Sequence, residues 1–160
     1  MMRDVLTVLL FAAALGSGIA AGIFFAFSTF VMRALARLPS REGIRAMQSI
    51  NAAVLNLMFA SVFVGTGAIA GLALVLSALL GDAVATMCIA IGAFAYGTGV
   101  IAVTMKRNVP LNEKLAAWHP DDESSDSFWK MYVLDWSRWN HLRTVAASVS
   151  MLLMIMALQL

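Results

Sequence analysis

The chain has 160 residues, of which 61% are hydrophobic and 12% are charged, and its formal net charge is +2. A soluble domain carries about 25% charged residues, so this composition argues against a water-soluble fold and indicates a membrane protein. The small basic excess needs no nucleic acid to explain it. The single cysteine, Cys88, excludes an internal disulfide and gives no support to a thiolate metal cluster.

Four long runs without charge divide the chain, at residues 5–32, 46–81, 83–105 and 144–160. A bilayer core about 30 Å thick needs roughly 20 helical residues, and the first three runs reach that length. The fourth reaches it if the Trp-rich segment before it extends into the headgroup layer. We therefore predict an all-α, integral membrane four-helix bundle in a single transmembrane domain, 1–160. Its spans are expected at about 5–32, 53–80, 83–105 and 138–159.

The basic residues are distributed unevenly along the chain. The termini and the Gly81-Asp82 turn carry only Arg3, whereas the other ten Lys and Arg lie in or beside the two connecting segments at the opposite end. Cytoplasmic loops of membrane proteins carry an excess of Lys and Arg, so this basic end is expected in the cytosol. The sequence predicts a multi-pass protein of the cell membrane with both termini outside the cytoplasm.

The first two spans carry small residues at a spacing of four, Gly18 with Gly22 and Gly67 with Gly71. This spacing lets helices approach closely in lipid, so all four glycines are expected at helix–helix contacts. The first span becomes aromatic toward its cytosolic end. Phe27 in this stretch is either a core or lipid-facing side chain, or part of the wall of a cavity for a flat apolar ligand.

The connection between the first and second spans contains a helix break at Pro39-Ser40. A new helix is expected from about Arg41, running straight into the second span. Asn51 lies at the entrance of this span, close to the hydrocarbon. A buried amide costs free energy unless it finds a partner, so Asn51 is expected either in an inter-helix hydrogen bond or in a shared polar pocket.

The third span ends at Lys106 and Arg107 and is followed by the sequence N-V-P-L-N. Asn108 before Val109-Pro110 fits an Asx-type turn, which predicts a short amphipathic cytosolic helix between spans three and four, with Asn112 near its start. An acidic loop, 121–127, then leads to the last helix.

The segment 129–143 holds three of the four tryptophans and a dense group of polar residues. Steps of three and four along a helix place one set of these side chains on a single face: Trp129, Tyr132, Trp136, Asn140 and Arg143. His141 points about a quarter-turn away. The stripe is either an interfacial aromatic belt with helix-end charges or the place where the chain does its chemistry.

Four stretches together resemble a known family: F-F-A-F-S-T-F-V-M-R-A-L (Phe24 to Leu35), A-M-Q-S-I-N (Ala46 to Asn51), N-V-P-L-N-E-K-L-A (Asn108 to Ala116) and W-S-R-W-N-H-L-R-T (Trp136 to Thr144). Along nearly its whole length the chain is similar to the small four-span membrane family that includes the anthrone oxygenases, or noranthrone monooxygenases. The resemblance implies oxidation of an activated benzylic carbon to an anthraquinone, with no metal and no cofactor.

Such a reaction needs a base, donors for an enolate oxygen and an apolar slot for a planar ring. His141 is the expected base because the pKa of imidazole lies near neutrality. We expect a catalytic group of His141, Arg143 and Asn140, with Arg143 and Asn140 as donors to the oxyanion. The expected substrate-binding group is Asn51, Asn108, Asn112, Trp136, Trp139, Tyr132 and Phe27, of which Asn108 and Asn112 are further candidate donors. Because the polar members occupy one membrane depth, we expect a cytosol-facing pocket that they line together.

Two functions stay open from the sequence. The first is an oxygenase acting on an apolar aromatic or quinone-like small molecule. The second is a non-catalytic membrane bundle that binds lipid or a small hydrophobe, or a subunit of a membrane assembly. The expected partners are membrane lipid and an apolar small molecule, with a homo-oligomer left open and no nucleic acid. A pocket joining His141, Asn51 and Asn108 favours the first function, and a solid bundle with its tryptophans facing lipid favours the second.

Overall fold

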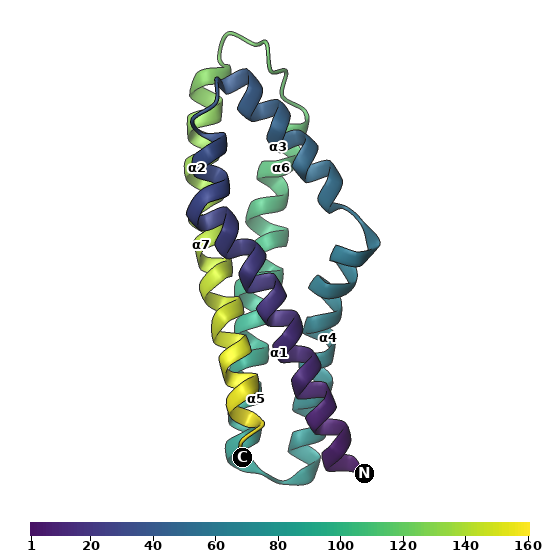
Figure 1. Cartoon of the computed structure of the whole chain (residues 1–160). Helices are drawn as coiled ribbons and strands as arrows, with labels where there is room; N and C mark the ends of the chain where they lie inside the picture. The colour runs from purple at the N-terminus through teal and green to yellow at the C-terminus, as the bar shows by residue number, and fades with distance from the viewer.

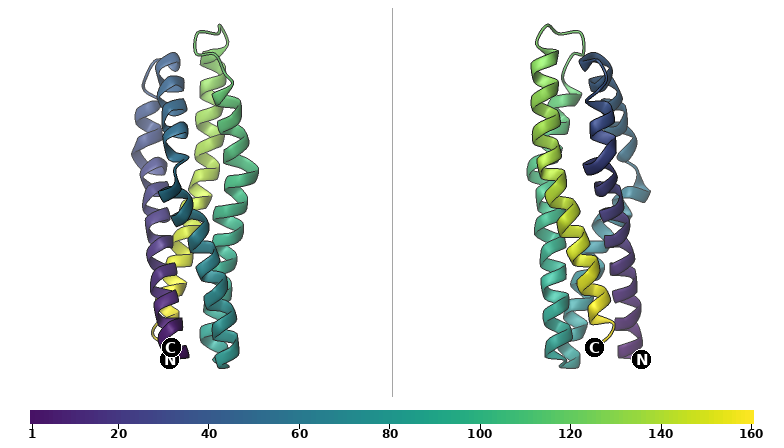
Figure 2. Two further views of the ribbon diagram at one scale, coloured as in Figure 1. Left: turned by 90° about the vertical axis from the view of Figure 1, so that its right-hand side faces the viewer. Right: turned by 60° about the vertical axis from the view of Figure 1, so that its left-hand side comes forward.

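The computed structural model describes residues 1–160, and every regular element in it is helical. Four long helical segments form an elongated bundle with both termini at one end (Figures 1 and 2). Each segment has a stretch long and apolar enough to cross a membrane: Met2–Leu35, Leu57–Leu80, Ala83–Ala116 and Ser125–Ala157. The predicted all-α bundle with four spans is therefore confirmed.

Two of these segments contain π-helical turns, which carry wider hydrogen-bond rings than an α-helix. The first segment is α1 (Met2–Ala26), η1 (Phe27–Val31) and α2 (Met32–Leu35); the third is α5 (Ala83–Phe94), η2 (Ala95–Ala102), η3 (Thr104–Asn108) and α6 (Val109–Ala116). The second and fourth spans are α4 (Leu57–Leu80) and α7 (Ser125–Ala157), and α3 (Ser40–Val54) precedes α4.

α3 does not run straight into the second span, so that prediction is wrong. The helix ends at Val54, and Figure 1 shows α3 and α4 meeting at a bend that stands out from the bundle. The Asn56 side chain caps α4 by accepting the Phe59 N–H at 2.9 Å, and it donates to the Ala53 carbonyl at 2.9 Å. These two bonds replace backbone bonds that a continuous helix would make, which stabilises the break.

The short helix expected after the third span is present as α6, but it continues that span without a break. Asn108 has helical backbone angles, φ −75° and ψ −40°, and forms no side-chain cap. Its Nδ2 instead donates to the Trp136 carbonyl at 3.3 Å, tying the third span to α7. Pro110 is the second residue of α6, just after the π-helical turn of η3, and the irregular bonding of such a turn tolerates a residue without an N–H.

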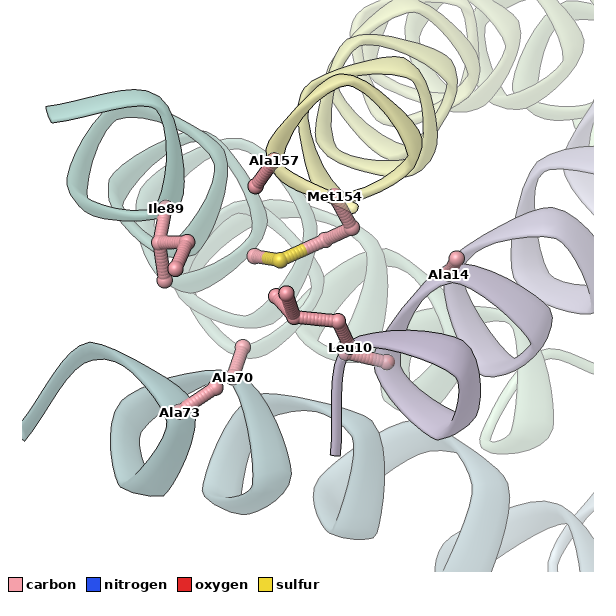
Figure 3. Packing of buried hydrophobic residues seen from close by; sticks show 8 residues of the cluster. Leu10, Ala14, Ala70, Ala73, Ile89, Met154 and Ala157 are labelled. Carbon is pink, nitrogen blue, oxygen red and sulfur yellow. The ribbon is translucent and has the colours of Figure 1, made fainter. Parts of the chain in front are cut away.

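Three apolar clusters lie along the bundle between its two ends. The outer cluster, nearest the termini, packs Leu10 against Met154, with small residues of α4 opposite them (Figure 3). The middle cluster includes Phe24, Phe63 and Tyr96, together with alanines of α1 and α7. The inner cluster, nearest the α6–α7 loop, is rich in aromatic residues of α7 and also holds Met32, Ile44, Met47 and Leu115.

The small residues pack as predicted at only two of the four positions. A Cβ at Gly18 would touch Met151 at 3.0 Å and one at Gly67 would touch Ile101 at 2.7 Å, so both glycines allow close helix contacts. Gly22 and Gly71 have open space around them, so the prediction is wrong there. A spacing of four selects one face of a helix but does not say which face meets the neighbour.

Candidate functional site

A cavity of about 130 Å³ lies between the middle and inner clusters and takes its walls from every long helical segment. Its polar lining is Asn51, Thr104, Asn108, Asn112, Asn140 and Arg143. Its apolar lining is Phe24, Phe27, Met47, Ile50, Val54, Leu55, Phe59, Val109 and Trp136. We call this cavity the amide pocket. Seven of the ten predicted site residues line it, although they come from four separate parts of the chain.

A larger hollow of about 700 Å³ lies between α1 and α7 near the termini. It is lined by apolar side chains with two neutral polar ones, Thr7 and Gln159, and contains no charged or titratable side chain. This composition fits a lipid-facing groove, so the amide pocket is the candidate site. Nowhere in the chain do three His, Cys, Asp or Glu side chains come close enough together to hold a metal ion.

Arg143 is the one charged residue of the amide pocket, and its side chain is 6% exposed. Its Nη1 donates to Thr104 Oγ1 at 3.2 Å and its Nη2 to Asn140 Oδ1 at 2.8 Å. The guanidinium carbon lies 4.4 Å from the centre of the Phe24 ring and 5.1 Å from that of Trp136. No carboxylate forms an ion pair with it, since the salt bridges of the protein all lie elsewhere. The pocket therefore holds a buried positive charge without a counter-ion.

Asn140 holds Arg143 in place. Its Nδ2 donates to the Phe24 carbonyl at 2.7 Å and to Ser28 Oγ at 2.8 Å, while its Oδ1 accepts the arginine bond. The π-helical turn of η1 brings Ser28 within reach of both Asn140 and Thr144. Because both ends of the amide are bonded within the protein, Asn140 positions the guanidinium and does not have a free group for a ligand.

Three polar atoms of the amide pocket are buried without a partner: Asn51 Nδ2, Asn108 Oδ1 and Arg143 Nε. The Asn108 amide is oriented by its bond to the Trp136 carbonyl, which leaves the oxygen free. Buried polar atoms are nearly always bonded, so three orphans around one cavity indicate a site for a polar ligand. All three atoms are fully buried, so a ligand in the cavity bonds to them only if the lining side chains shift.

Asn112 fixes the aromatic wall of the amide pocket. Its Oδ1 accepts the Tyr132 hydroxyl and the Trp136 indole N–H, both at 2.9 Å. The Trp136 ring then packs against Phe27, with centroids 5.4 Å apart and planes at 52°. Tyr132 is fully buried but lies behind the lining and contacts it through Asn112. Of the aromatic residues predicted as walls, Trp136 and Phe27 therefore line the amide pocket, and Tyr132 supports the lining through Asn112.

Besides Tyr132, two predicted site residues do not line the amide pocket. His141 is exposed and does not line it, so the prediction that His141 shares a pocket with Asn51 and Asn108 is wrong. Asn140 and Arg143 are three residues apart and share the inward face of α7, whereas His141 is turned about 100° from Asn140. Trp139 also lies outside, half-buried beside the guanidinium groups of Arg107 and Arg138, 4.7 and 5.8 Å from its ring.

The sequence patterns did not indicate Thr104 or the lining residues of the bend, Val54, Leu55 and Phe59. Thr104 lies one turn before Asn108, so a helix drawn through Pro110 would have placed the two side chains on one face. No signal in the sequence pointed to the bend, because an uncharged run reads as one uninterrupted span.

The chain also matches a known protein family. The family model described as anthrone oxygenase matches residues 56–153, more than half of the chain. The match includes Asn108, Asn112, Trp136, Asn140 and Arg143, and it confirms the resemblance inferred from the sequence. No curated protein and no solved structure matches the chain.

Proposed function

Because this chain belongs to the anthrone oxygenase family, we propose that it is a membrane oxygenase that binds an acidic aromatic molecule as its anion and oxidises it with dioxygen. The observation that carries the proposal is Arg143, a guanidinium that is 6% exposed, has no carboxylate partner and has an unbonded Nε. An ionisable group at membrane depth is costly and is typical of a functional site.

An oxyanion bound in the amide pocket supplies the negative counter-charge that Arg143 lacks. After a shift of the lining side chains that exposes them, Arg143 Nε and Asn51 Nδ2 donate to this oxygen, and hydrogen bonds with an ionised partner are about twice as strong as neutral ones. Asn108 Oδ1 accepts a hydroxyl elsewhere on the ligand. Burial strengthens the attraction between the charges, because the local dielectric is far below that of water. The pocket thus stabilises the anion of the substrate over its neutral form.

The amide pocket contains neither a carboxylate nor an imidazole in its lining. In this proposal the substrate proton leaves to water, and the positive charge of Arg143 replaces a general base by lowering the pKa of the bound substrate. Each unit of that shift corresponds to about 1.36 kcal/mol of preference for the anion. His141, exposed to the outside of the bundle, has no part in this route.

The reaction balances without a further reductant. The bound enolate gives its electrons to dioxygen, and a C–O bond forms at the activated benzylic carbon to give a hydroperoxide. Loss of the second hydrogen of that carbon with the distal oxygen releases water and leaves a carbonyl. A CH₂ group and one O₂ thereby become C=O and H₂O. The protein contributes orientation of the ring by Trp136 and Phe27 and stabilisation of the anion by Arg143.

The test is oxygen consumption and quinone formation by the purified protein with an anthrone as substrate. Loss of one oxyanion donor costs about 10²–10³ in kcat, so Arg143→Met is expected to lose activity on that scale. His141→Ala is the matched control and is expected to keep full activity, because the side chain lies outside the amide pocket. Full activity in Arg143→Met together with its loss in His141→Ala contradicts the proposal. Binding without oxygen consumption in the unmodified protein supports a non-catalytic carrier instead.

A further inference from the structure

A group of basic and aromatic side chains lies on the outside of the bundle, where η3 meets α7, and none of its members lines the amide pocket. The guanidinium carbons of Arg107 and Arg138 lie 4.7 and 5.8 Å from the centre of the Trp139 ring. Both arginines are exposed, and Trp139 is half-buried. We call these three residues the arginine–tryptophan cluster. It gathers two cations from different helical segments around one indole ring.

The two cations of this cluster have no acidic partner in the protein. The salt bridges of the chain use other basic groups, which are Arg41, Arg45 and the N-terminus. Asp135, one turn before Trp139 on α7, pairs with neither arginine of the cluster. The indole N–H of Trp139 bonds to no protein group and is not one of the buried unbonded atoms. The cluster therefore leaves two positive charges and one N–H donor for a partner outside the protein.

The cluster lies at the boundary between the hydrocarbon and the lipid headgroups. The uncharged run of the third span ends just before Arg107, and that of the fourth span begins shortly after Trp139. The bond from Asn108 to the Trp136 carbonyl, at 3.3 Å, holds the two segments together near this level. Tryptophan and arginine are typical of this boundary, where the indole stays partly in the apolar layer and the cation reaches the headgroups.

Below the cluster, toward the hydrocarbon, α7 presents an apolar strip to its surroundings. Leu142 and Val145 follow Arg138 at steps of four and three, so they share its face of the helix. Their side chains are 44% and 60% exposed. An anion held by the arginines therefore lies next to a surface that suits an acyl chain, and a small soluble anion would use only the charged half of this face.

We infer that the arginine–tryptophan cluster binds the phosphate headgroup of an anionic phospholipid, whose acyl chains lie along the exposed apolar strip of α7. Guanidinium groups bond phosphate oxygens through paired N–H donors, and such charge-assisted bonds are strong. Basic groups between spans at the headgroup level are typical of sites for anionic lipids. The bound lipid joins η3 to α7, which carry Asn108 and Arg143 of the amide pocket. This inference is independent of the proposed oxidation, since it needs no substrate in the amide pocket.

The test compares the binding of phosphatidylglycerol and of phosphatidylcholine with the same acyl chains to the purified protein, measured by native mass spectrometry. Each basic side chain near an anionic lipid surface changes affinity about fivefold, so phosphatidylglycerol is expected to bind at least about tenfold more tightly. The double variant Arg107→Gln with Arg138→Gln is expected to lose this preference. The matched control, Arg33→Gln with Arg37→Gln, removes two exposed cations without salt bridges from the same end of the bundle and is expected to keep it.

A further variant is expected to bind the anionic lipid more tightly, which misfolding cannot imitate. Asp135→Asn removes the carboxylate one turn from the cluster, so the preference for phosphatidylglycerol is expected to rise at least about twofold. An unchanged or lower preference in this variant counts against the inference.

Three other outcomes overturn the inference. The first is equal binding of the two lipids by the unmodified protein. The second is the same change of preference in the Arg107 and Arg138 variant as in the Arg33 and Arg37 control, because the site is then no more than the general charge of this end of the bundle. The third is competition by glycerol 1-phosphate as effective as that by the intact lipid, which would assign the cluster to a soluble phosphate ester and leave no role for the apolar strip.

Discussion

Replacing Arg143 by methionine distinguishes the effect of the buried charge on folding stability from its effect on ligand binding. The variant loses two hydrogen bonds of a charged donor, at about 1.5–3 kcal/mol each, and two cation–π contacts, at about 0.5–1 kcal/mol each. It recovers the desolvation penalty of a buried ion, which is on the order of 5 kcal/mol after relaxation. No carboxylate is left unpaired, since none faces Arg143. The free energy of unfolding is therefore expected to change by less than about 3 kcal/mol.

The response to an anionic ligand is expected to change much more clearly. At 100 times its dissociation constant, a ligand stabilises the native state by about 2.7 kcal/mol, which raises Tm by about 5–10 °C for a chain of this size. Thermal unfolding in detergent with and without a phenolate probe measures both quantities in one assay. The unmodified protein is expected to show the rise and Arg143→Met to show none.

The control for this assay is Arg138→Met, which removes an exposed guanidinium from the same helix and is expected to keep the ligand response. A variant Arg143→Met that unfolds far below the unmodified protein and still gains the full ligand-induced rise in Tm would contradict this prediction. That pattern would assign Arg143 to the stability of the bundle and leave the anion bound by other groups.

Three further predictions test the fold around the site. Gly16→Leu is expected to destabilise the bundle, because its side chain would collide with Thr66 of α4, while Gly71→Leu, with open space around it, is expected to leave Tm unchanged. Asn112→Leu is expected to cost about 2–4 kcal/mol of stability, since it leaves two buried aromatic donors without an acceptor, and a similar Tm to that of the unmodified protein would contradict the assigned wall. A cysteine at Ser124 is expected to react only with reagents that reach the cytosol, and labelling from outside intact cells would reverse the predicted orientation.

The spans and the inward stripe of α7 followed from the sequence because both depend on local patterns. Hydropathy over about 20 residues predicts a span, and steps of three and four predicted that Trp136, Asn140 and Arg143 share a face. The same periodicity had turned His141 away from that face. His141 was expected in the site because the pKa of imidazole suits a general base. Its side chain is exposed on another face of α7, so it cannot take that role in the amide pocket.

The bend and the continuation of the third span depend on side-chain hydrogen bonds, which leave no periodic signal. Asn56 interrupts an uncharged run because its side-chain amide makes two hydrogen bonds to the backbone. The Asn108 amide donates to the Trp136 carbonyl and does not form the expected Asx turn. Both amides are polar residues in apolar surroundings, and the sequence says that they need partners without saying which partners they take.

The central claim is that the amide pocket prefers an anion because of Arg143, and the pKa of a bound chromophore measures this directly. A nitrophenol absorbs at different wavelengths as phenol and as phenolate, so a pH titration of its absorption in the presence of saturating protein gives the pKa of the bound molecule. We predict that this pKa lies at least about one unit below that of the free nitrophenol, and that Arg143→Met returns it to the free value or above. A bound pKa equal to or higher than the free one in the unmodified protein contradicts the claim.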